Sequence, residues 1–232
     1  MRKSLLIIIL LVIGSLGVNA QEKFLIINGG LTKPLSDFAS SNFDNSDAGF
    51  ATNGYNFGFE LANFFSPWFG LGGSFKFNNA GFNSQVYNDA LNDRYKNELD
   101  TIYLSSGDYS LHNFLAGPYG KIDMGDHLSI FAKTFIGVMS SFRPDQALVY
   151  RYYGDLEDSK LFSQGKLTGA FAWNFGVGFI MKISDSFSIL AMADYIAANP
   201  KFDVYDYEKI EIVKEIQAVR YVNYNIGIAL NL

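Results

Sequence analysis

The sequence has no cysteine, only two histidines and fewer basic than acidic residues. Without cysteine the chain can form no disulfide bond and cannot be a lipoprotein. Eighteen Lys and Arg stand against 23 Asp and Glu, and the basic residues are scattered among the acidic ones. A phosphate-binding surface needs a concentrated basic patch, so we exclude nucleic acid as a partner.

Long apolar runs are also missing beyond the first residues. The run at 5–13 follows Arg2 and Lys3 and precedes the small-residue exit Val18-Asn19-Ala20, which predicts a signal peptide over residues 1–20 that is cleaved after Ala20. An uncleaved anchor is the alternative, but the run is too short to span about 30 Å of hydrocarbon. No later run of about 20 apolar residues exists, which excludes a helical membrane protein. We expect one domain over residues 21–232.

What the sequence does have is Phe, Tyr and Gly, and apolar residues that recur at every second position. A period of two predicts a β-strand with one apolar face. The clearest case is the C-terminal stretch, where one face carries Val222, Tyr224, Ile226, Ile228, Leu230 and Leu232 and the other carries Asn223, Asn225, Gly227, Ala229 and Asn231.

Eight such stretches predict eight strands, and the connections between them alternate long and short. The strands cover about 23–35, 54–64, 68–78, 110–124, 127–141, 169–182, 187–197 and a last one ending at Leu232. Three short turns and four long connections are typical of an outer-membrane barrel, whose short turns lie in the periplasm and whose long loops lie outside the cell. We therefore predict an all-β, eight-stranded antiparallel transmembrane β-barrel, closed because lipid cannot satisfy a free sheet edge. A soluble β-sandwich is the alternative fold.

Three segments carry a resemblance to a known family. FLIINGGLTKPL, GYNFGFELANFFSPWFGLGGSFKF and the terminal VNYNIGIALNL resemble the small outer-membrane β-barrel proteins of the OmpX and OmpA-membrane-domain kind, the porin-family β-barrels. The resemblance covers the chain after the signal and implies an architecture, not an activity. The final Leu232 departs from the family, which commonly ends in an aromatic residue.

The alternation assigns charges of both signs to the lumen. Because charges away from bulk water must be paired or solvated, and because eight strands enclose a space that side chains just fill, we predict a polar network that plugs the barrel. A polar conduit for ions or small solutes is the alternative. The predicted lumen residues are Glu60, Lys76, Lys121, Asp123, Lys133, Lys182 and Asp194.

Aromatic residues near strand ends are predicted to anchor the barrel at the two membrane interfaces. They are Trp68, Trp173, Tyr195, Tyr221 and Tyr224. In the loops, Tyr150, Arg151, Tyr152, Tyr153, Tyr205 and Tyr207 form aromatic and charged segments with the composition of contact surfaces.

Two loop features have alternatives. The alternation of the last strand continues backward through Ile210, Ile212 and Ile216, so this extension either pairs with the strand before it, which we favour, or offers an edge to a partner by β-augmentation. The acidic segment 44–47 lacks the spacing and closing Glu of a calcium loop, so we interpret it as a solvated loop.

One constellation suggests chemistry. Ser110 and His112 share a strand face near its outer end, and a Ser hydroxyl needs a neighbouring base to act as a nucleophile. Lipid A deacylases carry His-x-Ser, whereas this order is Ser-x-His, and no acidic residue is evident to orient the His. We therefore expect no catalysis, no cofactor and no metal.

The sequence thus predicts an exported outer-membrane protein of a Gram-negative bacterium, in contact with lipid and lipopolysaccharide. Its expected role is structural or in surface interactions with other outer-membrane or surface proteins, alone or as a subunit of a larger outer-membrane complex. A narrow porin is the first alternative and a lipid A-modifying enzyme the second.

Overall fold

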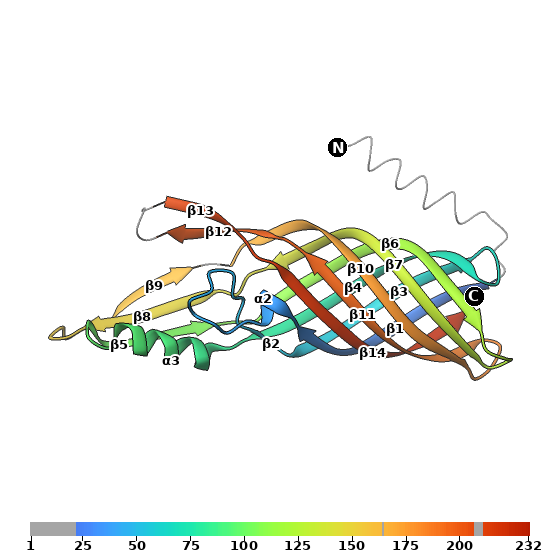
Figure 1. Cartoon of the computed structure of the whole chain (residues 1–232), viewed down its shortest axis with the longest axis horizontal. Helices are drawn as coiled ribbons and strands as arrows, with labels where there is room; N and C mark the ends of the chain where they lie inside the picture. The colour runs from blue at the N-terminus through green and yellow to red at the C-terminus, as the bar shows by residue number, and fades with distance from the viewer. Residues whose placement is uncertain (1–21, 164, 207–210) are drawn as a thin grey trace.

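The computed structural model describes residues 22–163, 165–206 and 211–232 (Figure 1). The predicted signal peptide and its cleavage site lie outside these residues. No helix in the described ranges is long and apolar enough to cross a membrane.

Eight long antiparallel strands form the predicted closed barrel, which occupies the right-hand half of Figure 1. The first strand pairs with the last, with Ile27 opposite Ile228, so no edge is left open in the wall. The ring is also continuous between β4 and β6, which are the third and fourth of the eight strands, with Phe75 opposite Phe114. In order around the ring the barrel strands are β1 (Glu22–Pro34), β3 (Gly54–Phe64), β4 (Phe69–Phe82), β6 (Tyr109–Asp123), β7 (Leu128–Phe142), β10 (Leu167–Lys182), β11 (Phe187–Ala198) and β14 (Val219–Asn231).

Side chains alternate between the two faces of the wall. Outward positions carry exposed apolar side chains such as Phe57, Phe171 and Ile226, while inward positions are buried. In a soluble protein such an exposed apolar band would be a liability, but it matches the lipid-facing surface of a membrane barrel. The short turns fall where the alternation predicts them, and Gly125 supplies the left-handed backbone, with φ of +82°, for the turn between β6 and β7.

The long connections contain more regular structure than the sequence indicated. The structure places α2 (Ser36–Ala39), β2 (Ala51–Thr52), α3 (Ser84–Tyr95), β5 (Leu99–Ser106), β8 (Gln146–Tyr152), β9 (Ser159–Ser163), β12 (Lys201–Asp206) and β13 (Glu211–Ile216) in segments that we interpreted only as polar connections or as a strand extension. These elements extend beyond the barrel on the side away from the C-terminus (Figure 1).

We call residues 83–106 and 143–163 the extracellular projection. Its strands form a sheet in the order β5-β8-β9, and α3 packs on it through Leu91, Ile102 and Leu104. The helix begins at Asn83, whose side chain accepts a hydrogen bond from the Val86 amide at 3.3 Å, as a good N-cap does. Separately, β12 and β13 pair as a hairpin, which agrees with the pairing we favoured for the extension.

Candidate functional site

Four charged side chains from four different strands meet in the middle of the barrel. They are Glu60 of β3, Lys76 of β4, Lys133 of β7 and Asp194 of β11, and we call them the interior charge cluster. Lys76 Nζ lies 3.0 Å from Glu60 Oε1 and 2.5 Å from Asp194 Oδ2, while Lys133 Nζ lies 2.7 Å from Glu60 Oε2 and 3.0 Å from Asp194 Oδ1. Each cation thus touches both anions, so the cluster is neutral as a whole.

All members of the cluster are at most 4% exposed, so bulk water does not solvate them. Further hydrogen bonds do this instead: Tyr119 donates its hydroxyl to Glu60, and Asn225 donates to Asp194 at 3.2 Å. Buried charges are tolerated only when they are paired and their remaining lone pairs are satisfied. Every carboxylate oxygen of the cluster has an ion-pair or hydrogen-bond contact, although Asp194 Oδ1 has only its ion-pair contact with Lys133 and accepts no hydrogen bond.

A glycine makes room for the cluster. A Cβ placed on Gly176 of β10 would lie 2.2 Å from Asp194 Oδ1 and 2.6 Å from Lys133 Cε. Real Cβ atoms do not approach that closely, so the absence of a side chain at this inward position is what lets the two charges meet. The small inward residues of the sequence therefore have a local packing reason here.

Polar and aromatic layers fill the barrel on both sides of the cluster. Toward the loops, Asn223 donates to Asn78 at 2.6 Å and accepts from Thr32 at 2.9 Å. Toward the turns, Lys121 pairs with Glu22 and its ammonium lies 5.3 Å from the Phe64 ring. Side chains thus fill the lumen at several levels along the barrel.

The first long connection folds over the extracellular end of the barrel. We call residues 36–50 the mouth cap; both of its end residues, Ser36 and Phe50, have left-handed backbone. Phe38 is fully buried and packs edge-on to Tyr109 with ring centroids 5.0 Å apart. The Tyr109 hydroxyl donates to the Gly49 carbonyl at 2.8 Å, which fastens the cap to β6.

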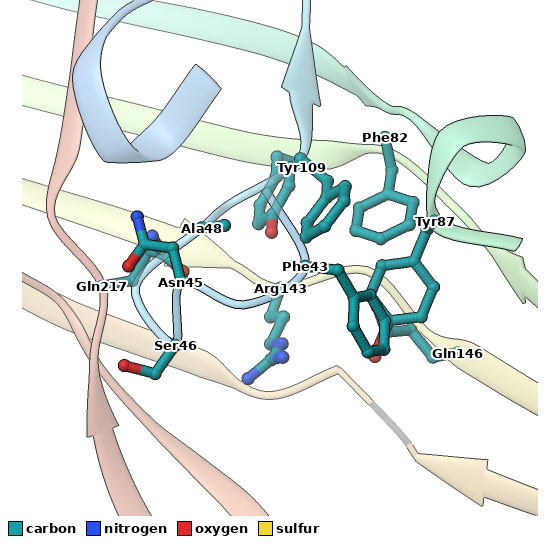
Figure 2. Close-up of a pocket in the computed structure, with 11 residues that line it drawn as sticks. Phe43, Asn45, Ser46, Ala48, Phe82, Tyr87, Tyr109, Arg143, Gln146 and Gln217 are labelled. Atoms are coloured by element: carbon teal, nitrogen blue, oxygen red, sulfur yellow. The ribbon is translucent and has the colours of Figure 1, made fainter. Parts of the chain in front are cut away.

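A small cavity remains beside the cap, which we call the cap pocket. Its volume is about 200 Å³, and Figure 2 shows aromatic rings on one side, amide and hydroxyl groups on the other and an arginine between them. The lining residues are Phe43, Asn45, Ser46, Ala48, Phe50, Phe82, Tyr87, Tyr109, Arg143, Gln146 and Gln217.

Comparison with known proteins now decides the family. The family model described as the outer membrane protein beta-barrel domain matches residues 6–214. The chain belongs to this family. The resemblance to small outer-membrane barrels is thereby confirmed, and the protein is an outer-membrane protein.

Among the solved structures that match the chain, OprG is similar enough in shape to support the fold. The outer membrane protein OprG of Pseudomonas aeruginosa is 11% identical, with a TM-score of 0.51 over 92% of this chain and 97% of its own. The attachment invasion locus protein Ail of Yersinia pestis, in complex with the heparin analogue sucrose octasulfate, is 15% identical, with a TM-score of 0.48 over 91% of this chain and 98% of its own. No curated protein matches the chain.

The predicted lumen residues separate into two groups. Glu60, Lys76, Lys133 and Asp194 meet in the interior charge cluster, and Lys121 is buried near the turns; Asp123 lies 3.4 Å from Lys121 but is exposed. The prediction that Lys182 lies in the lumen is wrong. This residue has the inward parity of β10, yet it stands at the last residue of the strand, beyond the packed interior, and pairs with Asp185 of the turn at 2.8 Å.

Two of the predicted anchors, Tyr224 and Tyr221, need correction as well. Trp68, Trp173 and Tyr224 are exposed on the outer surface, and Tyr195 packs beside Trp173 with ring centroids 5.3 Å apart. Tyr224 lies in the middle of β14 rather than at its end.

Tyr221 is not an anchor. It is 0% exposed and accepts a hydrogen bond from Asn113 at 2.6 Å inside the barrel. Tyr221 is two residues before Asn223 and therefore shares its face of the strand, which indicates an inward position.

The predicted contact residues of the loops have different environments. Tyr150 packs on the core of the projection, and Arg151 pairs with Asp100 at 2.6 Å, a contact that raises the pKa of its guanidinium. Tyr152 and Tyr153 are exposed. Tyr205 belongs to β12, where only the backbone is described, and Tyr207 lies outside the described residues.

Ser110 and His112 lie together on the outward face of β6, near its outer end. The Ser110 hydroxyl and His112 Nε2 are 3.0 Å apart, and the imidazole packs edge-on to Phe77. Within the described part of the chain no carboxylate contacts His112, and no group of three His, Asp or Glu side chains is suited to hold a metal. The pair therefore has a nucleophile and a base without the group that would orient the base.

The sequence did not predict the mouth cap or the cap pocket. The signal was present, because Phe38, Phe43 and Phe50 are isolated aromatic residues in an otherwise polar segment. Aromatic residues in a long loop indicate that the loop packs on something.

Proposed function

We propose that this protein is a closed, non-catalytic barrel whose task is to hold a folded extracellular surface for contacts with other molecules, alone or within a larger outer-membrane complex. The observation that carries the proposal is the filled interior: the neutral charge cluster, the layers around it and the mouth cap occupy the path that a solute would take. A barrel of eight strands has little space beyond what side chains fill.

Single-channel recording in planar bilayers tests whether the barrel is closed. We expect the intact protein to give no stable ohmic step. The double variant Lys76→Ala, Asp194→Ala removes one charge of each sign together with volume, so it serves as a matched control in which a water path is easier to form. A stable step from the unmodified protein would contradict the proposal.

A narrow channel is the alternative, and one observation favours it. The side-chain nitrogen and oxygen of Asn56 are buried without a protein hydrogen bond, as is Oδ1 of Asn174. Buried amides of this kind usually bind water, so the lumen is expected to contain water molecules between its layers. Conduction would require these molecules to form a continuous file past the charge cluster.

The contact surface is supported by the projection itself, which has its own core and presents Tyr152 and Tyr153 to solvent. Because Phe142 pairs with Leu167, residues 143–166 can be replaced by a short turn without disturbing the wall. A gentle-detergent pull-down with the intact and shortened proteins should recover outer-membrane or surface proteins only with the former. Equal recovery would exclude the projection as the contact surface.

A lipid A-modifying activity is the remaining candidate, and the 3.0 Å contact between Ser110 and His112 on the lipid-facing side is the observation behind it. Cells that express the intact protein are compared with cells that express Ser110→Ala or His112→Ala, with lipid A analysed by mass spectrometry. We expect identical lipid A in all three. A difference that depends on both residues would establish catalysis.

A further inference from the structure

The cap pocket lies where five separate parts of the chain meet at the extracellular end. The mouth cap supplies Phe43 to Phe50, the end of β4 and the start of α3 supply Phe82 and Tyr87, and the start of β6 supplies Tyr109. The segment after β7 supplies Arg143, and the segment before β14 supplies Gln217. A cavity built from so many elements depends on the folded projection and on the cap at the same time. It therefore exists only in the complete extracellular structure.

One wall of the pocket is aromatic. Tyr87 is the centre of this wall, with ring centroids 4.9 Å from Phe50, 5.1 Å from Phe43 and 5.6 Å from Phe82. Tyr87 packs edge to face on Phe43 and Phe50 and at a tilt on Phe82, so the rings hold one another in place. The wall is thus a rigid surface that offers ring faces and edges to a ligand at low entropic cost.

The opposite side is polar, and some of its hydrogen-bonding groups already bind other parts of the protein. Gln217 donates through Nε2 to the Asp47 carbonyl at 2.8 Å, and Asn45 accepts from the Asp47 amide at 3.0 Å. These bonds fix both amide planes and leave further donors and acceptors for a ligand. Figure 2 shows Gln217, Asn45 and Ser46 together on this side of the pocket.

Gln146 differs from these amides. Its backbone pairs with Ser106 and Ser163 in the projection sheet, but across residues 22–163, 165–206 and 211–232 its side-chain amide has no protein hydrogen-bond partner. A half-buried amide with two donors and one acceptor at the edge of an aromatic wall is suited to a ligand with hydroxyl groups.

The size of the pocket limits the ligand. A volume of about 200 Å³ suits a small ligand of the size of a single six-membered ring. A pyranose combines an apolar C–H face, which packs on aromatic rings, with a rim of hydroxyls, which amides bind in pairs. An apolar aromatic ligand would leave the polar side unpaired, at a cost in affinity.

We propose that the cap pocket binds a single pyranose, such as the terminal residue of a surface glycan. This deepens the proposed function, on which it rests for the extracellular contact role, by giving one part of the contact surface a ligand class. Tyr87, Phe50 and Phe43 would form the stacking wall, and Gln146 and Gln217 would bind the hydroxyls.

The test uses the full-length protein in phospholipid nanodiscs, because maltoside and glucoside detergents would compete for the site. The probes are the methyl glycosides of glucose, galactose and N-acetylglucosamine, with sorbitol as an open-chain polyol and indole as an apolar ring, followed by saturation-transfer NMR and titration. We expect saturable binding of at least one glycoside with a Kd on the order of millimolar, and none of sorbitol.

Three variants locate the site. Gln146→Ala should weaken binding about tenfold, the effect of losing one or two hydrogen bonds. Ala48→Leu should abolish it by filling the cavity without removing a contact, and Gln85→Ala, an exposed amide on α3, should leave it unchanged. Retention of heat-modifiable migration on gels shows that each variant is folded.

Two outcomes would overturn the inference. Either no glycoside binds at tens of millimolar, whether or not indole does, or Ala48→Leu leaves glycoside binding unchanged. Neither outcome affects the pull-down with the shortened projection, so failure of the pyranose site and failure of the proposed contact role can be told apart.

Discussion

The barrel and the extracellular projection are built on opposite principles within one chain. In the barrel, exposed positions are apolar, as at Phe179, which is 53% exposed, and the centre holds two buried Lys–carboxylate pairs. In the projection, the centre is apolar, with Leu91 of α3 and Ile102 of β5 buried between the helix and the sheet, and the ion pairs lie on the surface.

This difference shows that the surroundings decide which residues form the core. Hydrocarbon outside the wall removes the penalty for exposed Phe and Ile and leaves polar groups to seek one another inside. Water around the projection restores the usual arrangement. The boundary between the two regimes runs at the outer ends of β4, β6 and β7, where the mouth cap sits.

The largest expected effect comes from unbalancing the interior charge cluster. Lys133→Met leaves Glu60 and Asp194 with one cation between them, and removal of one partner from a buried ion pair costs about 3–5 kcal/mol. Urea unfolding in lipid vesicles should show this loss. The double variant Lys133→Met, Glu60→Gln restores neutrality and should recover much of it; an unchanged midpoint in the single variant would show that the cluster contributes nothing.

A lysine placed on an exposed apolar residue should give different results in the two regions. Phe175→Lys puts a charge on the lipid-facing wall near the middle of β10 and should cost about 2–4 kcal/mol. Leu156→Lys changes a residue that is 96% exposed in the projection and should stay within about 0.5 kcal/mol. The same vesicle assay measures both, and equal costs would erase the proposed contrast.

Truncation of a side chain in the core of the projection should destabilise the projection and leave the barrel folded. Leu91→Ala removes a buried side chain between α3 and the sheet, at a cost of about 2–3 kcal/mol. Limited proteolysis on whole cells should then cut within residues 83–106, while the barrel keeps its heat-modifiable migration. Val86→Ala, at an exposed position of the same helix, is the control and should leave the cleavage pattern unchanged.

The smallest effect is pH-dependent and belongs to the surface of α3. A hydrogen bond from Lys96 at 2.8 Å lowers the pKa of Asp93 below its ordinary value of 3.8. Because the pKa of Asp93 is lower in the folded protein, the stabilisation is fully present above the ordinary pKa of 3.8. It is lost as the pH falls through the lower, folded-state pKa. Hydrogen exchange of α3 amides should therefore differ between wild type and Asp93→Asn at neutral pH and converge in acid; a constant difference would assign the effect elsewhere.

Much of the barrel could be predicted because a period of two is a local property of the sequence. The last strand shows this best, since the residues from Val222 to Asn231 keep strict alternation and lie in the wall as expected. The projection could not be predicted in the same way. In α3 only Tyr87, Leu91 and Tyr95 repeat at helical spacing within a polar segment, which is a weak signal until the sheet beneath it is known.

The site followed the same division. Parity placed Glu60, Lys76, Lys133 and Asp194 on inward positions, but the stagger of neighbouring strands decides which charges meet, and no single strand encodes it. Lys182 shows the limit of parity, since an inward position at a strand end is already in water. Tyr221 shows the opposite error. Its alternation with Asn223 indicates an inward position, but its place near a strand end suggested an interface anchor.

The interior charge cluster also bears on how the molecule is assembled. Its four members come from β3, β4, β7 and β11, so none of them finds both of its partners until the wall has curled round on itself. An unfinished sheet in the bilayer would carry stranded charges, each at a cost of several kcal/mol. We therefore expect closure of the ring and neutralisation of the cluster to occur together, with partly inserted forms disfavoured.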